Sequence, residues 1–196
     1  MKGTIMATIT IFGTGNMGTA IKSVFEDAGA TVQSLDSHSE NPTIEGDIVV
    51  LAVPYPALAS IAEQYGDQLE GKTVVDITNP LDFSTFDSLV VPADSSAAAE
   101  LQAKLPKSHV LKAFNTVFAT NIASKKTGNA QSTVLVAGDD DAAKAAFIDL
   151  VKAGGLDAID AGALKRAREL EAFGFLQLAL AVQKKIGFNA GFAVYR

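Results

Sequence analysis

The sequence predicts an α/β fold in which a doubly wound, mostly parallel sheet is followed by a long C-terminal helix. Short apolar runs alternate with segments of helical periodicity along most of the 196 residues, which is typical of parallel strands joined by helical crossovers. The central runs are apolar at nearly every position, as in strands that are covered on both faces. A glycine-rich turn follows the first run directly, so the carboxyl edge of the sheet is where we expect a ligand.

The first strand is expected at residues 8–12, and the turn G-x-G-x-x-G follows it with Gly13, Gly15 and Gly18. A helix with apolar side chains at helical spacing is expected at 19–28. In this Rossmann-like context Gly13 allows the tight turn, Gly15 leaves room for a pyrophosphate, and Gly18 lets the helix pack on the strand. The helix N-terminus offers N–H groups and a positive dipole end to the diphosphate. The alternative is a glycine turn that binds nothing.

The second strand is expected at 29–36 and ends in Asp36. A carboxylate there can hold both hydroxyls of an adenosine ribose and would repel a 2′-phosphate, which favours NAD. Ser37, His38 and Ser39 follow, and they can bind that phosphate if Asp36 turns away. In a third interpretation Asp36 only caps the loop.

The remaining chain continues the alternation of strands and helices. Strands are expected at 47–53, 73–77, 109–114, 132–137 and 156–160, and helices from Pro56 through Tyr65, at 96–104, from 139–141 through Ala153, and at 164–185. Residues 81–95 lack periodicity but are too apolar for disorder, which favours a functional loop. We expect one NAD(P)-binding domain over residues 1–196, with a core at about 7–160 and a helical C-terminal segment at about 161–196.

Distinctive residues lie at the ends of the expected strands, where open parallel sheets bind ligands. The candidate cofactor-binding residues are Gly13, Thr14, Gly15, Asn16, Met17 and Gly18; Asp36, Ser37 and His38; Val53, Pro54 and Tyr55; Asn79 and Pro80; and Phe114, Asn115 and Thr116. Their amides and hydroxyls can bind a nicotinamide carboxamide or a ribose, while Val53 and Pro54 can flank the rings. Alone, each asparagine segment can be a simple turn; together, beside the glycine turn, they favour a binding site.

Composition excludes several classes of function. The formal charge of −6 argues against nucleic acid or an anionic membrane as a partner. The chain has no cysteine and two histidines, His38 and His109, so thiol chemistry is excluded and a multi-histidine metal site is not expected. His109, at the start of a strand, is expected to be structural. The N-terminus does not resemble a secretion signal, so we expect a cytoplasmic protein.

No side chain is expected to be catalytic in its own right. The sequence shows no acid–base pair and no serine–histidine–acid arrangement at recognisable spacing, so hydrolysis has no support. Hydride transfer between two ring systems needs close stacking instead, because the cofactor carries the chemistry. The same absence leaves a second function open, namely a sensor or scaffold that binds a dinucleotide without turnover.

Motifs along nearly the whole chain carry a family resemblance. They lie at 11–18, 76–81, 111–116, 136–140, 160–164 and 167–171, and the motif at 111–116 is the most specific. In this order they resemble the coenzyme F420-dependent NADP oxidoreductase family, whose dinucleotide domain also occurs in the STEAP metalloreductases. The resemblance implies hydride transfer between a nicotinamide cofactor and a second ring system, such as a flavin or deazaflavin, with no covalent intermediate.

The resemblance also implies NADP as the cofactor. NAD remains the alternative, because the second strand of the family usually ends in a Ser-Arg type pair and here it ends in Asp36-Ser37. The expected partner is a small-molecule redox acceptor.

The C-terminal helix predicts a homodimer. From Phe173 onward it is apolar nearly all round, which is more than a helix with one solvent-facing side needs. A symmetric dimer is the commonest cover for such a surface. The alternative is that the tail at 188–195 covers the helix within one chain.

Overall fold

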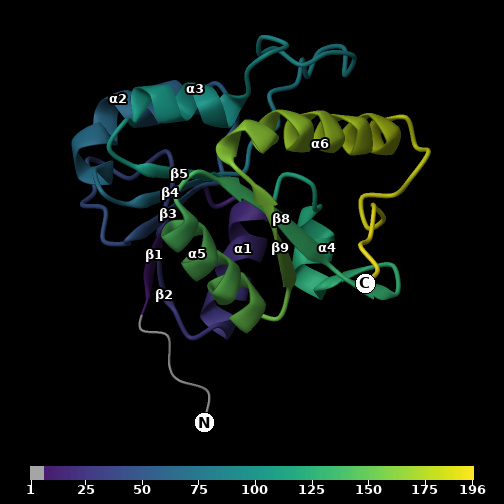
Figure 1. Cartoon of the computed structure of the whole chain (residues 1–196), viewed down its shortest axis with the longest axis horizontal. Coiled ribbons are helices and arrows are strands. Elements are labelled where there is room, and N and C mark those ends of the chain that lie inside the picture. Colours follow the sequence, from purple (N-terminus) through teal and green to yellow (C-terminus); the bar gives the residue numbers. More distant parts are fainter. Residues whose placement is uncertain (1–6) are drawn as a thin grey trace.

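The computed structural model describes residues 7–196 and has a seven-stranded sheet between two layers of helices (Figure 1). The strands of this sheet are β1 (Thr8–Phe12), β2 (Thr31–Leu35), β3 (Ile48–Leu51), β4 (Thr73–Asp76), β5 (His109–Lys112), β8 (Thr133–Gly138) and β9 (Asp157–Gly162). Their order is β2-β1-β3-β4-β5-β8-β9. Strands β1 to β5 are parallel, whereas β8 is antiparallel to β5 and parallel to β9. The predicted doubly wound, mostly parallel sheet is confirmed.

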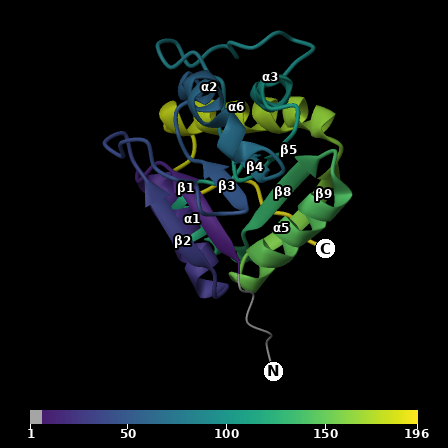
Figure 2. The same cartoon turned by 90° about the vertical axis from the view of Figure 1, so that its left-hand side faces the viewer.

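Helices cover both faces of the sheet, as the two views in Figures 1 and 2 show. One layer contains α1 (Asn16–Asp27), α4 (Ala119–Ser124) and α5 (Asp141–Ala153), and the other contains α2 (Ala57–Leu69), α3 (Ala97–Lys104) and α6 (Ala167–Val182). Within residues 7–196, no helix is both long enough and apolar enough to cross a membrane.

Three local features differ from or refine the sequence-based expectation. The predicted helix at 164–185 is a 3-10 turn at Leu164–Arg166 followed by α6, which ends at Val182. A small hairpin of β6 (Lys126–Thr127) and β7 (Ala130–Gln131) precedes β8. Helix α4 lies where no element was predicted.

Each face of the sheet carries its own apolar core, which fixes the strand ends in place. On the α1 and α5 side, Phe25, Phe114 and Phe147 pack edge to face with ring centroids 6.0 to 6.3 Å apart. On the other side, buried Leu101 of α3 and Ala167 of α6 pack in one cluster with the strands. Because β1, β3, β4 and β5 are parallel and in close register, the residues after them gather at one edge of the sheet.

Candidate dinucleotide-binding site

The glycine turn between β1 and α1 contains one glycine that the fold itself does not require. A Cβ atom at Gly13 would lie 2.1 Å from the Ala52 carbonyl oxygen, and one at Gly18 would lie 1.9 Å from the Gly13 carbonyl oxygen. Gly13 also has a φ of +106°, which few other residues adopt. A Cβ at Gly15 would meet nothing within 4 Å, and its φ of −73° is ordinary. The bare backbone at Gly15 therefore fits the close approach of a pyrophosphate.

The N-terminus of α1 begins directly after this glycine. Gly15 is the N-cap, and in the described chain no side chain accepts a hydrogen bond from this end of the helix. The first turn of α1 contains no acidic residue. Its N–H groups and the positive end of the helix dipole are thus available to an anion.

A cleft of about 600 Å³ opens on one side of this N-terminus, between the ends of β1, β2 and β3 and helix α2. We call it the Asp36 cleft. It is lined by Phe12, Gly13, Thr14, Gly15, Leu35, Asp36, Ser37, Ser39, Ala52, Val53, Pro54, Ala57, Ile61, Gln64 and Tyr65. The cleft brings together the predicted residues from three different strand ends, and its size is suited to a small molecule.

Asp36 caps its own loop and also lines the cleft. Its Oδ1 atom accepts hydrogen bonds from the His38 backbone N–H at 3.0 Å and from the Ser39 hydroxyl at 3.0 Å. The bond from the His38 N–H, followed by that from Ser39, lowers the pKa of Asp36 below its usual value. Among the residues described, no partner is found for Oδ2. The carboxylate is therefore ionised at neutral pH, and one of its oxygens is left for a ligand.

A second cavity, of about 340 Å³, lies on the other side of the glycine turn. We call it the Asn79 pocket. Its walls come from the start of α1, the ends of β4 and β5, the start of α4, helix α6 and the C-terminal tail. It is lined by Asn16, Met17, Ile77, Asn79, Asn115, Val117, Phe118, Ala119, Thr120, Leu178 and Phe188.

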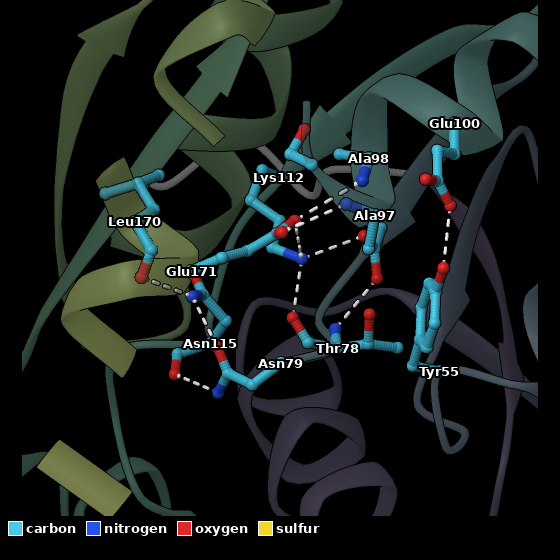
Figure 3. Close-up of polar contacts among 12 residues, drawn as sticks. Tyr55, Thr78, Asn79, Ala97, Ala98, Glu100, Lys112, Asn115, Leu170 and Glu171 are labelled. Atoms are coloured by element: carbon cyan, nitrogen blue, oxygen red, sulfur yellow. Dashed lines mark hydrogen bonds and ion pairs between the residues drawn. The ribbon is translucent and has the colours of Figure 1, made fainter. Parts of the chain in front are cut away.

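Two asparagines from neighbouring strand ends bind each other in this pocket (Figure 3). The Asn79 Nδ2 atom donates to the Asn115 carbonyl oxygen at 2.9 Å, and the Asn115 Nδ2 atom donates to Asn79 Oδ1 at 2.9 Å and to the Leu170 carbonyl oxygen at 2.8 Å. A Cβ at Gly174 of α6 would lie 2.4 Å from Asn79 Oδ1. Only a glycine at this position lets α6 pack closely against the pair.

A buried ion cluster lies beneath the asparagine pair. The Lys112 ammonium contacts Asp76 at 2.8 Å and Glu171 at 2.8 Å and donates to the Thr78 carbonyl oxygen at 2.5 Å (Figure 3). The three charged side chains are at most 1% exposed. Burial raises the pKa of Glu171, and the Lys112 charge opposes this shift.

Glu171 also joins α6 to the N-terminus of α3, because its oxygens accept from the Ala97 and Ala98 N–H groups at 3.0 and 3.3 Å. Sequence reasoning gave these charged residues no role. The available signal was a lysine inside the otherwise apolar end of β5.

Several predicted site residues line neither cavity. These are Gly18, His38, Tyr55, Pro80, Phe114 and Thr116. The side chain of Phe114 is fully buried in the core, so only its backbone lies near the strand end. The Tyr55 hydroxyl donates to Glu100 at 2.7 Å (Figure 3), and burial, followed by this bond, raises the pKa of Tyr55 to about 12. Outside the site, the His109 Nδ1 atom lies 3.1 Å from Asp140.

The fold and the two cavities beside the glycine turn define a Rossmann-like protein of the dinucleotide-binding class. The model of the family described as NADP oxidoreductase, coenzyme F420-dependent, matches residues 25–80. The F420-dependent NADP reductase of Methanocaldococcus jannaschii is 32% identical over 168 residues, which cover 84% of this chain and 75% of that protein. The chain therefore belongs to the coenzyme F420-dependent NADP oxidoreductase family. It is an oxidoreductase that uses a nicotinamide cofactor and acts on a small molecule.

Two further relatives extend this comparison. The metalloreductase STEAP3 of Rattus norvegicus is 35% identical over 126 residues, which cover 64% of this chain and 24% of that protein. A solved structure from Arthrobacter sp. FB24, described as an F420-dependent NADP-reductase, superposes with a TM-score of 0.82 at 26% identity and covers 96% of this chain and 99% of its own. The family resemblance predicted from the sequence motifs is confirmed.

Proposed function

We propose that this protein transfers hydride between NADP and a second planar ring system, which is a deazaflavin of the F420 type or a flavin. The observation that carries this proposal is the pair of cavities on either side of the α1 N-terminus. The Asp36 cleft suits the adenosine half of a dinucleotide, and the Asn79 pocket suits the nicotinamide half and its reaction partner. The relative from Methanocaldococcus jannaschii, an F420-dependent NADP reductase, supports the choice of the ring system.

In this proposal the protein binds and orients, and it supplies no acid or base. The N–H groups at the α1 N-terminus hold the diphosphate beside Gly15, and Val53 and Pro54 flank the adenine. The amides of Asn79 and Asn115 hold the carboxamide end of the nicotinamide. When bound, the reduced cofactor supplies one hydride, becoming oxidised, and the acceptor takes up that hydride together with one proton from water.

The preference for NADP over NAD is also part of this proposal. Ser37 and Ser39 place two hydroxyls at the edge of the Asp36 cleft, and hydroxyls of this kind can hold a 2′-phosphate. Ser39 already donates to Asp36 Oδ1, so this carboxylate stays within the loop. A 2′-phosphate would have to bind beside the ionised Asp36, and family membership is the reason for preferring NADP despite this repulsion.

Steady-state oxidation of NADPH and NADH with a panel of acceptors tests the function. The panel contains oxidised F420, FMN, riboflavin and a soluble quinone. We expect turnover with NADPH and F420 or a flavin, at rates well above those with the quinone. Tight NADPH binding without turnover on any member of the panel would contradict the proposed acceptor class.

We further propose that two copies of the chain associate through α6 and the tail that follows it. Leu176 and Val182 of α6 are 50% and 41% exposed, which supports a covered surface in the assembled protein.

A further inference from the structure

The Asn79 pocket has two chemically different walls. The wall nearest the glycine turn carries amide groups, from Asn16 of α1 and from Asn79 and Asn115 at the strand ends. The opposite wall is mainly apolar and comes from the start of α4, Leu178 of α6 and Phe188 of the C-terminal tail. A polar wall suits a carboxamide, whereas an aromatic and aliphatic wall suits the face of a second ring system.

The tail is docked by hydrogen bonds to its backbone and by an aromatic contact of Phe192. The Thr120 hydroxyl donates to the Phe188 carbonyl oxygen, and the Asn121 Nδ2 atom donates to the Ala190 carbonyl oxygen at 2.9 Å. Further along, Phe192 packs on Phe173 of α6 with ring centroids 5.0 Å apart. These contacts hold the tail over α4 and α6 in addition to the packing of the Phe188 ring on Phe118.

The Phe188 ring lies at the rim of the pocket beside Phe118. Their centroids are 5.3 Å apart, and the ring planes are inclined by 58°. Phe188 is 53% exposed, so a large part of its ring surface is accessible at the pocket.

We propose that Phe118 and Phe188 form the aromatic wall of the acceptor subsite, and that Phe188 determines which planar, fused ring system enters the Asn79 pocket. This inference rests on the proposed function, and it deepens that function by naming the wall that contacts the second substrate. The C-terminal tail then determines acceptor specificity, while the glycine turn and Asp36 cleft determine cofactor binding.

The test measures acceptor binding separately from turnover. Oxidised F420 and riboflavin are titrated by fluorescence into the complex of the full chain with NADP⁺, in which both rings are oxidised and no hydride can transfer. Phe188→Ala should weaken binding of the ring probe by about tenfold or more, with the Kd for NADP⁺ unchanged within about twofold. Phe188→Tyr retains the ring and should behave like the wild type.

Phe192→Ala is the matched control, because it removes the same side chain from the same tail outside the pocket. We expect it to leave binding of the ring probes unchanged. An equal loss in Phe192→Ala would show that docking of the tail, rather than the Phe188 ring, is what matters, and would overturn the proposal. Unchanged binding in Phe188→Ala would overturn it as well, as would a wild-type NADP⁺ complex that binds neither probe. Tight probe binding without turnover of NADPH would contradict the proposed function alone and leave the subsite supported.

Discussion

Gly13, Gly15 and Gly18 lie within one turn, but a side chain added to each would meet different surroundings. At Gly13 and Gly18 the new atom would meet backbone oxygens at 2.1 and 1.9 Å, distances at which the chain has to move. At Gly15 it would enter open space. Packing of the protein thus explains two of the glycines, and a ligand is the natural explanation for the third.

Replacing Gly15 by Val should impair cofactor binding and leave the fold intact. The extended backbone at Gly15 accepts a branched residue, whose side chain then occupies the space that the pyrophosphate needs. We expect the affinity for NADPH to fall by more than about tenfold, or about 1.4 kcal/mol, by calorimetry. Gly18→Ala should instead lower the melting temperature. Unchanged affinity in the Gly15 variant would remove the pyrophosphate from this turn.

Replacing Asp36 by Asn should shift cofactor preference toward NADPH. The amide oxygen of Asn can keep the bonds from the His38 N–H and the Ser39 hydroxyl, so the change removes mainly the charge. Because a neutral amide no longer repels a 2′-phosphate, the ratio of the NADH dissociation constant to the NADPH dissociation constant should rise about fivefold.

Asp82→Asn is the control for the Asp36 variant. Asp82 is also held by local bonds from Ser84 and Thr85 and lines neither cavity. Asp82→Asn should leave the ratio of the NADH and NADPH dissociation constants unchanged. An unchanged ratio in Asp36→Asn would show that the 2′-position of the cofactor does not bind beside Asp36.

At the scale of whole elements, Gly174 is the glycine that lets α6 pack closely against the asparagine pair. Ala usually stabilises a helix relative to Gly by up to about 1 kcal/mol. The methyl group of an alanine at position 174 would clash with Asn79 Oδ1. Gly174→Ala should therefore fail to raise the melting temperature, and it should raise the KM for NADPH. Gly66→Ala in α2 is the control, because its Cβ would only touch Leu105 at 3.8 Å. A stabilised Gly174→Ala enzyme with an unchanged KM would contradict this account.

The buried ion cluster predicts a stability loss that depends on pH. Lys112→Met leaves Asp76 and Glu171 buried without their cation, which should cost about 3 to 5 kcal/mol of unfolding free energy. Burial raises the pKa of Glu171 in the folded state, so the folded chain binds more protons than the unfolded chain, and stability falls as pH rises. Urea unfolding should therefore show a loss that grows as the pH rises above the ordinary pKa of glutamate, about 4.3.

Lys107→Met is the control for the cluster. Its pair with Glu70 at 2.7 Å is solvent-exposed, so its loss should change stability much less than the loss of Lys112. An equal loss of unfolding free energy in Lys112→Met and Lys107→Met would show that the buried cluster contributes no more to stability than an exposed ion pair.

Local patterns predicted most elements but not the contacts between distant ones. Helix α4 was missed because six residues with two threonine or serine positions carry too little helical periodicity to detect. Tyr55 and Phe114 were placed in the site because they lie at or just after the ends of expected strands, but the pattern cannot show which way a side chain points there. The Lys112 cluster depends on three segments far apart in sequence, so no local window contains it.

For the molecule as a whole, the alternation of elements predicted the doubly wound sheet, and the turn chemistry predicted the edge that carries the candidate site. The reversal of β8 was not predicted, because hydrophobic runs report burial and not direction. The aromatic wall of the Asn79 pocket was missed for a related reason. It is built in part by the tail, which was expected only as an alternative cover for the C-terminal helix, and no local pattern shows that Phe188 would line a pocket.

The last prediction concerns the surface of α6 that this returning tail leaves uncovered. Phe192 covers Phe173, as the alternative of burial within one chain expects, but Leu176 stays half-exposed and Tyr195 is 78% exposed. We expect light scattering after size-exclusion chromatography to give about twice the chain mass of 20.4 kDa at micromolar concentration. Leu176→Glu should shift the protein to the monomer, whereas Phe83→Glu, in an exposed loop elsewhere, should not. A mass of one chain across the concentration range would show that the tail alone is sufficient cover for α6.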